Sequence, residues 1–257
     1  ASCDDDTLRA FSADTGTLYI PINTLTAQLR VRIFNDSSYE GPETFTVRLS
    51  KPVSVGFPKV AGGLTDTSIH SFEFTGTIID DDLAPLVKVF ADSAVKEGNT
   101  GTRAQTFTTR LFDPYSPANP LALANAPQIP VSFRWRTLEA SATILDSDYV
   151  AQATRWDTIP ALGLTKSISV LVKGDTRYEI DEFYTVAIDT ARNGTVSGTV
   201  SDSGIVLNDD AAPTVTISDI SVQEPAKYGD TAWATFTYKI SSASGLTTTV
   251  FWSTQNG

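Results

Sequence analysis

Carboxylate side chains recur in this chain at a fixed spacing. Residues 35–45 contain three acidic positions, and residues 174–184 repeat the same positions 139 residues later. A second acidic group follows each stretch. The members are Asp36, Glu40, Glu43, Asp80, Asp81 and Asp82 in the first copy, and Asp175, Glu179, Glu182, Asp209 and Asp210 in the second. Carboxylates gathered within a few ångströms repel one another, so protons or a hard divalent cation must offset their charge.

Calcium is the cation that such a set of donors fits best. Calcium accepts six to eight oxygen ligands in flexible geometry, whereas magnesium takes fewer protein ligands and retains water. Zinc is disfavoured because the chain has only one histidine, His70, and one cysteine, Cys3. Acidic turns are most often simply solvated, which is the competing interpretation. The repeated spacing and the cost of an uncompensated cluster favour calcium.

The residues around these groups predict short strands. Phe45, Val47 and Leu49 alternate with polar residues, and Tyr184, Val186 and Ile188 repeat the pattern. Turns rich in Gly, Asn, Asp and Pro separate the strands, and no long segment has helical periodicity. An all-β fold of tandem immunoglobulin-like sandwiches follows, with about seven strands in each complete unit. Alternate turns and the end of the last strand share one pole, where the acidic groups should converge.

A second offset defines the units. Gly76 and Asp82 recur 128 residues later as Gly204 and Asp210. The predicted units are the later part of one repeat at 1–82, a complete repeat at 83–210, and the earlier part of a third at 211–257. Trp135 and Trp252 are equivalent in this scheme. We therefore expect a segment of a longer array.

Net charge, apolar runs and cysteine content limit the kinds of partner and of bracing that the chain is expected to have. A formal net charge of -11 argues against nucleic acid or an anionic membrane surface. No apolar run approaches the ~18 residues that predict a membrane helix, so direct membrane insertion is not expected. The single cysteine excludes an internal disulfide framework, which leaves the sheet cores to hold the fold, with metal as a further brace.

The acidic motif resembles that of the Calx-beta repeats, which occur in sodium/calcium exchangers and in large extracellular adhesion proteins. The shared signature is Asp-x-x-Tyr-Glu-x-x-Glu-x-Phe/Tyr, starting here at Asp36 and Asp175 and followed by the terminal acidic cluster. The resemblance covers essentially the whole chain and implies a calcium site in each unit. It adds as ligands Glu97, Asp148, the carbonyl of Arg177 and Glu224, with Asp5 or Asp6 as further candidates. Gly174 and Asn208 stand where strongly binding members carry Asp, so the second unit would hold fewer ions or hold them weakly.

One segment departs from the repeat. Phe107 and Trp135 are 28 positions apart, whereas the equivalent Phe236 and Trp252 are 16 apart, so the complete unit carries about 12 extra residues. Five prolines fall in this insertion. It should lie at the pole opposite its own acidic group, and we predict that residues 113–130 pack against the preceding junction near residues 80–82. The alternative is a tolerated surface insertion.

Two classes of function fit these expectations. The first is a non-enzymatic calcium-binding segment of an extracellular or cell-surface protein, in which calcium rigidifies the junctions for adhesion or fibre formation. Its partners would be neighbouring repeats, adjacent copies in a filament, or a cell-surface or matrix ligand. The second, implied by the exchangers, is a calcium-sensing regulatory module of a membrane protein. A carboxylate-based glycoside hydrolase is a remote third, because the sequence has no separate cleft signature and no Ser-His-Asp pattern. The four tryptophans are expected in cores or on sheet faces, in preference to sugar platforms.

Overall fold

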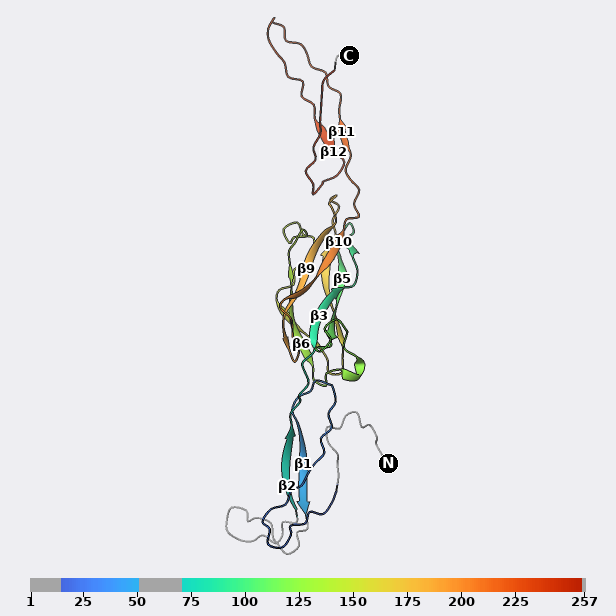
Figure 1. Cartoon of the computed structure of the whole chain (residues 1–257). Coiled ribbons are helices and arrows are strands. Elements are labelled where there is room, and N and C mark those ends of the chain that lie inside the picture. The colour runs from blue at the N-terminus through green and yellow to red at the C-terminus, as the bar shows by residue number, and fades with distance from the viewer. Residues whose placement is uncertain (1–14, 51–70, 256–257) are drawn as a thin grey trace, which may run out of the picture.

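The computed structural model describes residues 15–50 and 71–255. These residues form an elongated chain with a central sandwich between two smaller two-stranded parts (Figure 1). No helix in the described part of the chain is long and apolar enough to cross a membrane. The residues Cys3, Asp5, Asp6 and His70 lie outside the described ranges.

The central sandwich consists of two facing sheets. One has the strand order β3-β5-β8 and the other β4-β10-β9-β6-β7. The strands are β3 (Leu86–Ala91), β4 (Val95–Lys96), β5 (Thr102–Phe112), β6 (Val131–Leu138), β7 (Arg155–Ile159), β8 (Thr165–Lys173), β9 (Glu182–Arg192) and β10 (Val200–Leu207). This arrangement confirms the expected all-β sandwich. The first edge strand is divided, because β3 pairs with β5 in one sheet and β4 pairs with β10 in the other.

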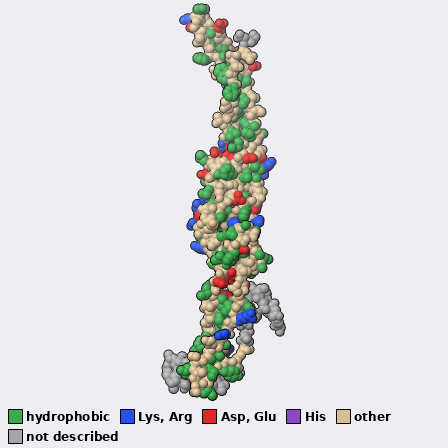
Figure 2. All heavy atoms as spheres, viewed as in Figure 1, with side chains coloured by type: hydrophobic (Ala, Val, Ile, Leu, Met, Phe, Trp, Pro, Cys, Tyr) green, Lys and Arg blue, Asp and Glu red, His purple; other side chains and the backbone are tan. Residues whose placement is uncertain are grey.

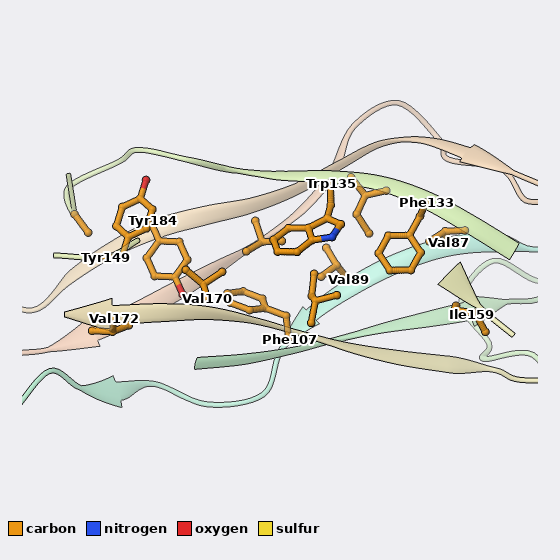
Figure 3. Close-up of a cluster of buried hydrophobic side chains, with 14 of the residues drawn as sticks. Val87, Val89, Phe107, Phe133, Trp135, Tyr149, Ile159, Val170, Val172 and Tyr184 are labelled. Carbon is orange, nitrogen blue, oxygen red and sulfur yellow. The ribbon is translucent and has the colours of Figure 1, made fainter. Parts of the chain in front are cut away.

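Alternating apolar side chains from both sheets form the core. Val87 and Val89 of β3, Phe107 of β5 and Trp135 of β6 are all buried in it (Figure 3). The period of two along each strand directs these residues inward and their polar neighbours outward. Full burial of a large apolar side chain contributes about 1.5–3 kcal/mol, so the sandwich has a sizeable core of its own.

A buried polar contact also joins the two sheets. Gln105 of β5 is fully buried, and its Nε2 donates to the carbonyl oxygens of Ser93, at 2.8 Å, and Ile205, at 3.2 Å. The hydroxyl of Tyr184 on β9 donates to Gln105 Oε1 at 2.7 Å. Because buried polar groups are costly when unpaired, these bonds fix how β5 lies over β9 and β10.

The N-terminal part repeats the β9–β10 hairpin. Strands β1 (Glu43–Ser50) and β2 (Ser71–Ile78) pair Phe45 with Gly76, just as β9 and β10 pair Tyr184 with Gly204. A Cβ atom on Gly76 would overlap the Phe45 ring, and one on Gly204 would overlap the Tyr184 ring. In both copies glycine therefore leaves room for the aromatic ring opposite it. The sequence repeat is also a repeat of structure.

The two flanking parts expose faces that are buried in the central unit. In the C-terminal part, β11 (Val215–Ile217) pairs with β12 (Tyr238–Ile240). Trp252 there is 76% exposed, whereas its equivalent Trp135 is 2% exposed. An open apolar groove of about 710 Å³ lies against the N-terminal hairpin. All strands of the sandwich fall within the predicted unit 83–210; the unit boundaries stay a prediction.

Candidate metal centre

Four separate segments bring acidic residues to one pole of the central sandwich. They are the β4–β5 turn, the β6–β7 loop, the β8–β9 loop and the residues that follow β10. Acidic side chains gather near both ends of the central unit (Figure 2). Glu97 and Asp148 are only 4% and 5% exposed. A buried carboxylate is stable only when a positive charge or a proton neutralises it, so the carboxylates at this pole need one or the other.

One group at this pole consists of Asp148, Glu179 and Glu182. Carboxylate oxygens from all three lie within 4.8 Å of one another. The Thr143 N–H donates to Asp148 Oδ2 at 2.6 Å, which fixes the orientation of that carboxylate. Glu182 is the first residue of β9, and the N–H of Glu179 donates to Asn208 Oδ1 at 3.2 Å. Backbone contacts thus hold three acidic groups together despite their repulsion.

A second group joins Glu97 with Asp175, Asp209 and Asp210. The Gly98 N–H donates to Asp209 Oδ1 at 3.0 Å, and Asn99 Nδ2 donates to Asp210 Oδ1 at 3.2 Å. These two bonds fasten the end of the unit to the β4–β5 turn. The other oxygen of Asp210, Oδ2, is buried and has no hydrogen-bond partner among the described residues. A buried carboxylate oxygen without a donor is a position that a cation would satisfy.

The pKa values at this pole express the same excess of negative charge. Burial raises the pKa of Glu97 to about 7, and the charges of Asp175, Glu179, Asp210 and Asp209 add to the effect. Burial also raises the pKa of Glu182 to about 7, helped by its contact with Asp148. For Glu179, burial raises the pKa while the Arg177 guanidinium lowers it. Oxygen donors with this surplus charge fit a hard cation such as calcium.

The first unit builds the same loop. The Ser38 N–H donates to Asp36 Oδ1 at 2.8 Å, and the equivalent Arg177 N–H donates to Asp175 Oδ1 at 2.7 Å. The Glu40 N–H donates to Asp80 Oδ2 at 3.1 Å, in the place where Glu179 uses Asn208. Burial, then the charges of Asp36, Glu43 and Asp80, raises the pKa of Glu40 to about 7. A similar charge surplus therefore exists at the first junction.

The remaining predicted ligands, Asp81, Arg177 and Glu224, differ in how close they lie to the acidic groups. Asp81 contributes to the raised pKa of Asp82, behind the larger effects of burial and of Asp80 and Asp36. The Arg177 side chain enters the cluster, with its Nη2 3.4 Å from Glu179 Oε1. The predicted role of the Arg177 carbonyl stays a prediction. Glu224 is exposed and belongs to neither acidic group.

Sequence reasoning missed Asp146 and Asp181. The charge of Asp146 raises the pKa values of both Glu179 and Glu182. Asp181 Oδ1 accepts the N–H of Asn208 at 3.0 Å and so helps to hold the terminal acidic segment. Asp146 lies two residues before a predicted ligand, and Asp181 lies inside the repeated motif. Their closeness in sequence to the predicted ligands Asp148 and Glu182 is the feature from which they could have been predicted.

The insertion packs against the preceding junction, which confirms that prediction. The Gln128 N–H donates to the Tyr39 carbonyl at 3.1 Å. A small cavity between the parts is lined by Tyr39 and Asp82 on one side and by Asp113 and Tyr115 on the other. Residues 113–130 therefore contact the loop that carries the first acidic group.

Comparisons with known proteins give structural likenesses only. No protein-family model and no curated protein matches the chain. The apo-form Calx CBD1 domain is 16% identical, with 48% of this chain and 98% of that chain covered and a TM-score of 0.36. The calcium binding domain CBD12 of CALX1.1 is 15% identical over 51% of this chain and 50% of that chain, with a TM-score of 0.36. The Calx CBD2 domain is 19% identical over 42% and 56%, with a TM-score of 0.30. The solved structures to which the chain is similar therefore include CBD domains of Calx.

Proposed function

We propose that this chain is a non-enzymatic, calcium-binding repeat segment. The observation that carries the proposal is the convergence of carboxylates from four segments at one pole, where Asp210 Oδ2 is buried and lacks a hydrogen-bond partner among the described residues. Protons can neutralise such a group only below the raised pKa values. At higher pH a hard divalent cation supplies the missing positive charge.

The central unit offers two adjoining sets of oxygen donors. Asp148, Glu179 and Glu182 form the tighter set. The second set comprises Glu97, Asp175, Asp209 and Asp210, among which Glu97 feels the charges of the other three. Arg177 already offsets part of the charge on Glu179 and would compete there with a cation. The first unit would use Asp36, Glu40, Glu43, Asp80 and Asp82, with Asp81 adding to the local charge.

Calcium at these positions would stiffen the junctions between units. Both acidic groups lie next to the connectors 83–85 and 211–213, which leave little slack. Ions that bind only the folded loops stabilise them by mass action. The segment would then serve an extracellular or cell-surface protein in adhesion or fibre formation, with neighbouring repeats, adjacent copies or a surface ligand as partners.

A calcium-sensing regulatory module is the second candidate. The bond between Gln128 and Tyr39 favours it, because it links an acidic loop directly to the next unit. Ion binding in that loop could then alter the angle between units. Affinity separates the candidates: among EF-hand proteins, sensors bind calcium at about 10⁻⁷–10⁻⁵ M and extracellular modules at about 10⁻⁴–10⁻³ M, and we expect the same contrast here.

Calorimetric titration of the chain with calcium, paired with thermal melts in calcium and in chelator, tests the proposal. We expect binding heat and a higher melting temperature in calcium. Asp157→Asn is the control for loss of one negative charge outside the acidic groups and should keep both the heat and the melting shift. Asp157 pairs with Lys166 at 3.5 Å and takes no part in the acidic groups. The proposal fails if the unsubstituted chain shows neither heat nor a melting shift.

A further inference from the structure

The unit that follows each acidic loop docks on the same position of that loop. The Gln128 N–H donates to the Tyr39 carbonyl at 3.1 Å, and the Gly245 N–H donates to the Tyr178 carbonyl at 3.0 Å. Tyr39 and Tyr178 are equivalent, because they are 139 positions apart in the repeat. The same backbone acceptor is therefore used at both junctions.

The docking residues are equivalent too. Gln128 precedes Trp135 by seven positions, and Gly245 precedes Trp252 by seven positions. Counting back from the tryptophan places the extra residues of segment 113–130 before Gln128, so they do not disturb the match. A contact made twice between equivalent residues belongs to the repeat and not to one junction alone.

Neighbouring contacts support the docking at each junction. The Ser38 hydroxyl donates to the Ala124 carbonyl at 3.5 Å, and Ser38 is buried beside the insertion. At the second junction, the Ser244 hydroxyl donates to the Tyr178 carbonyl at 3.3 Å. In both cases the following unit contacts the loop that carries the acidic side chains.

The two docking residues differ in what they present to the acidic group. Gln128 Nε2 donates to Glu40 Oε1. Gly245 has no side chain, and a Cβ atom there would overlap Glu179 Oε1. Glu40 and Glu179 are equivalent in the repeat. At the first junction an amide holds the glutamate, whereas at the second the glutamate fills the space that a side chain would need.

We propose that the residue seven positions before the tryptophan is a positioning residue for the cation site of the preceding unit. Gln128 holds one oxygen of Glu40 and leaves the other for the ion, while Gly245 leaves room for Glu179. Each site is thus completed by the unit that follows it. This inference rests on the proposed calcium binding and adds the inter-unit residue that governs each site.

Reciprocal substitutions in the full chain test this assignment. Calcium titration followed by ¹⁵N amide signals of Glu40 and Glu179 reports the two sites separately. We expect Gln128→Gly to weaken the first site about three- to tenfold, as loss of one typical intramolecular hydrogen bond would. The second site should be unchanged. Gly245→Gln and the smaller Gly245→Ala should weaken only the second site.

Controls separate positioning from folding and from the proposed function. Ala118→Gly introduces the same residue at an exposed position of the same insertion and should alter neither site. Amide spectra without calcium establish that each variant keeps its fold, and Gly245→Ala serves if Gly245→Gln does not. In those spectra, Gln128→Gly should also raise the titration midpoint of Glu40, whose pKa the Gln128 bond lowers. If Gln128→Gly and Gly245→Gln both bind calcium with unchanged affinities, this inference is wrong while the proposed function stands. No calcium binding by the unsubstituted chain overturns the proposed function.

Discussion

The two acidic sites share a loop but differ in what surrounds it. Asp36 and Asp175 accept equivalent backbone N–H bonds at 2.8 and 2.7 Å. Within residues 15–50 and 71–255, only the central site adds two buried carboxylates, Glu97 from the β4–β5 turn and Asp148 from the β6–β7 loop. The first site instead receives Gln128 from the following unit. The motif thus determines the shape of the loop, while the complete sandwich supplies the buried carboxylates.

Disrupting the core of the sandwich should have the largest effect, and it should affect the central site far more than the first site. Phe107 is fully buried, so we expect Phe107→Ala to destabilise the central unit by about 3–5 kcal/mol and to weaken its calcium site. Phe74→Ala in β2 is the matched control, because Phe74 is 51% exposed. Urea unfolding measures both. Equal effects of the two substitutions would show that the central core does not dominate stability.

Removing one carboxylate should lower the calcium affinity and raise the stability of the chain in chelator. Glu182→Gln deletes a charge that Asp148 and Glu179 repel. We expect affinity at the central site to fall at least about tenfold, as loss of a charged ligand implies, while the first site is retained. Stability in chelator at pH 7.5 should rise, because repulsion is relieved. Calorimetry and urea unfolding check the two directions, and a loss of stability in chelator would contradict the account.

The raised pKa values predict how stability depends on pH. Glu40, Glu97 and Glu182 have folded pKa values of about 7, above the ordinary value of 4.5. Their contribution to stability is therefore complete below about pH 4.5 and is lost as pH rises through about 7. Calcium should raise the melting temperature more at pH 7.5 than at pH 5.5. A calcium shift that is the same at both pH values would contradict these assignments.

The smallest expected effect concerns Asp80 and its equivalent Asn208. Both side chains accept a backbone N–H, from Glu40 and Glu179 respectively, so the exchange keeps the scaffold while it alters charge. Asn208→Asp should strengthen calcium binding at the central site a few-fold, and Asp80→Asn should weaken the first site by a similar factor. Site-resolved titration measures both changes. Weaker central binding in Asn208→Asp would argue that the amide itself is needed, through its bond to the Asp210 carbonyl at 3.1 Å.

The sequence predicted the sandwich because periodicity and repeat offsets agree. The alternation of Tyr184, Val186 and Ile188 marks β9, and the offset maps β9 onto β1. The division of β3 from β4 was not predicted, since it depends on pairing with two different sheets. A local pattern carries no information about which sheet an edge strand joins.

The clustering of acidic side chains was predictable for members of the repeated motif and less so for the others. Asp146 was missed because its position depends on the fold of the β6–β7 loop, which Thr143 and Asp148 close. Glu224 is exposed, and its role as a ligand stays a prediction. The docking of Gln128 and Gly245 required the geometry of both junctions.

An anomalous difference map from crystals grown with calcium tests the central claim most directly. We predict peaks beside Asp148, Glu179 and Glu182 in the central unit, and beside Asp36, Glu40 and Asp80 in the first. Crystals that diffract well in calcium but show no anomalous peak at either group would contradict the account.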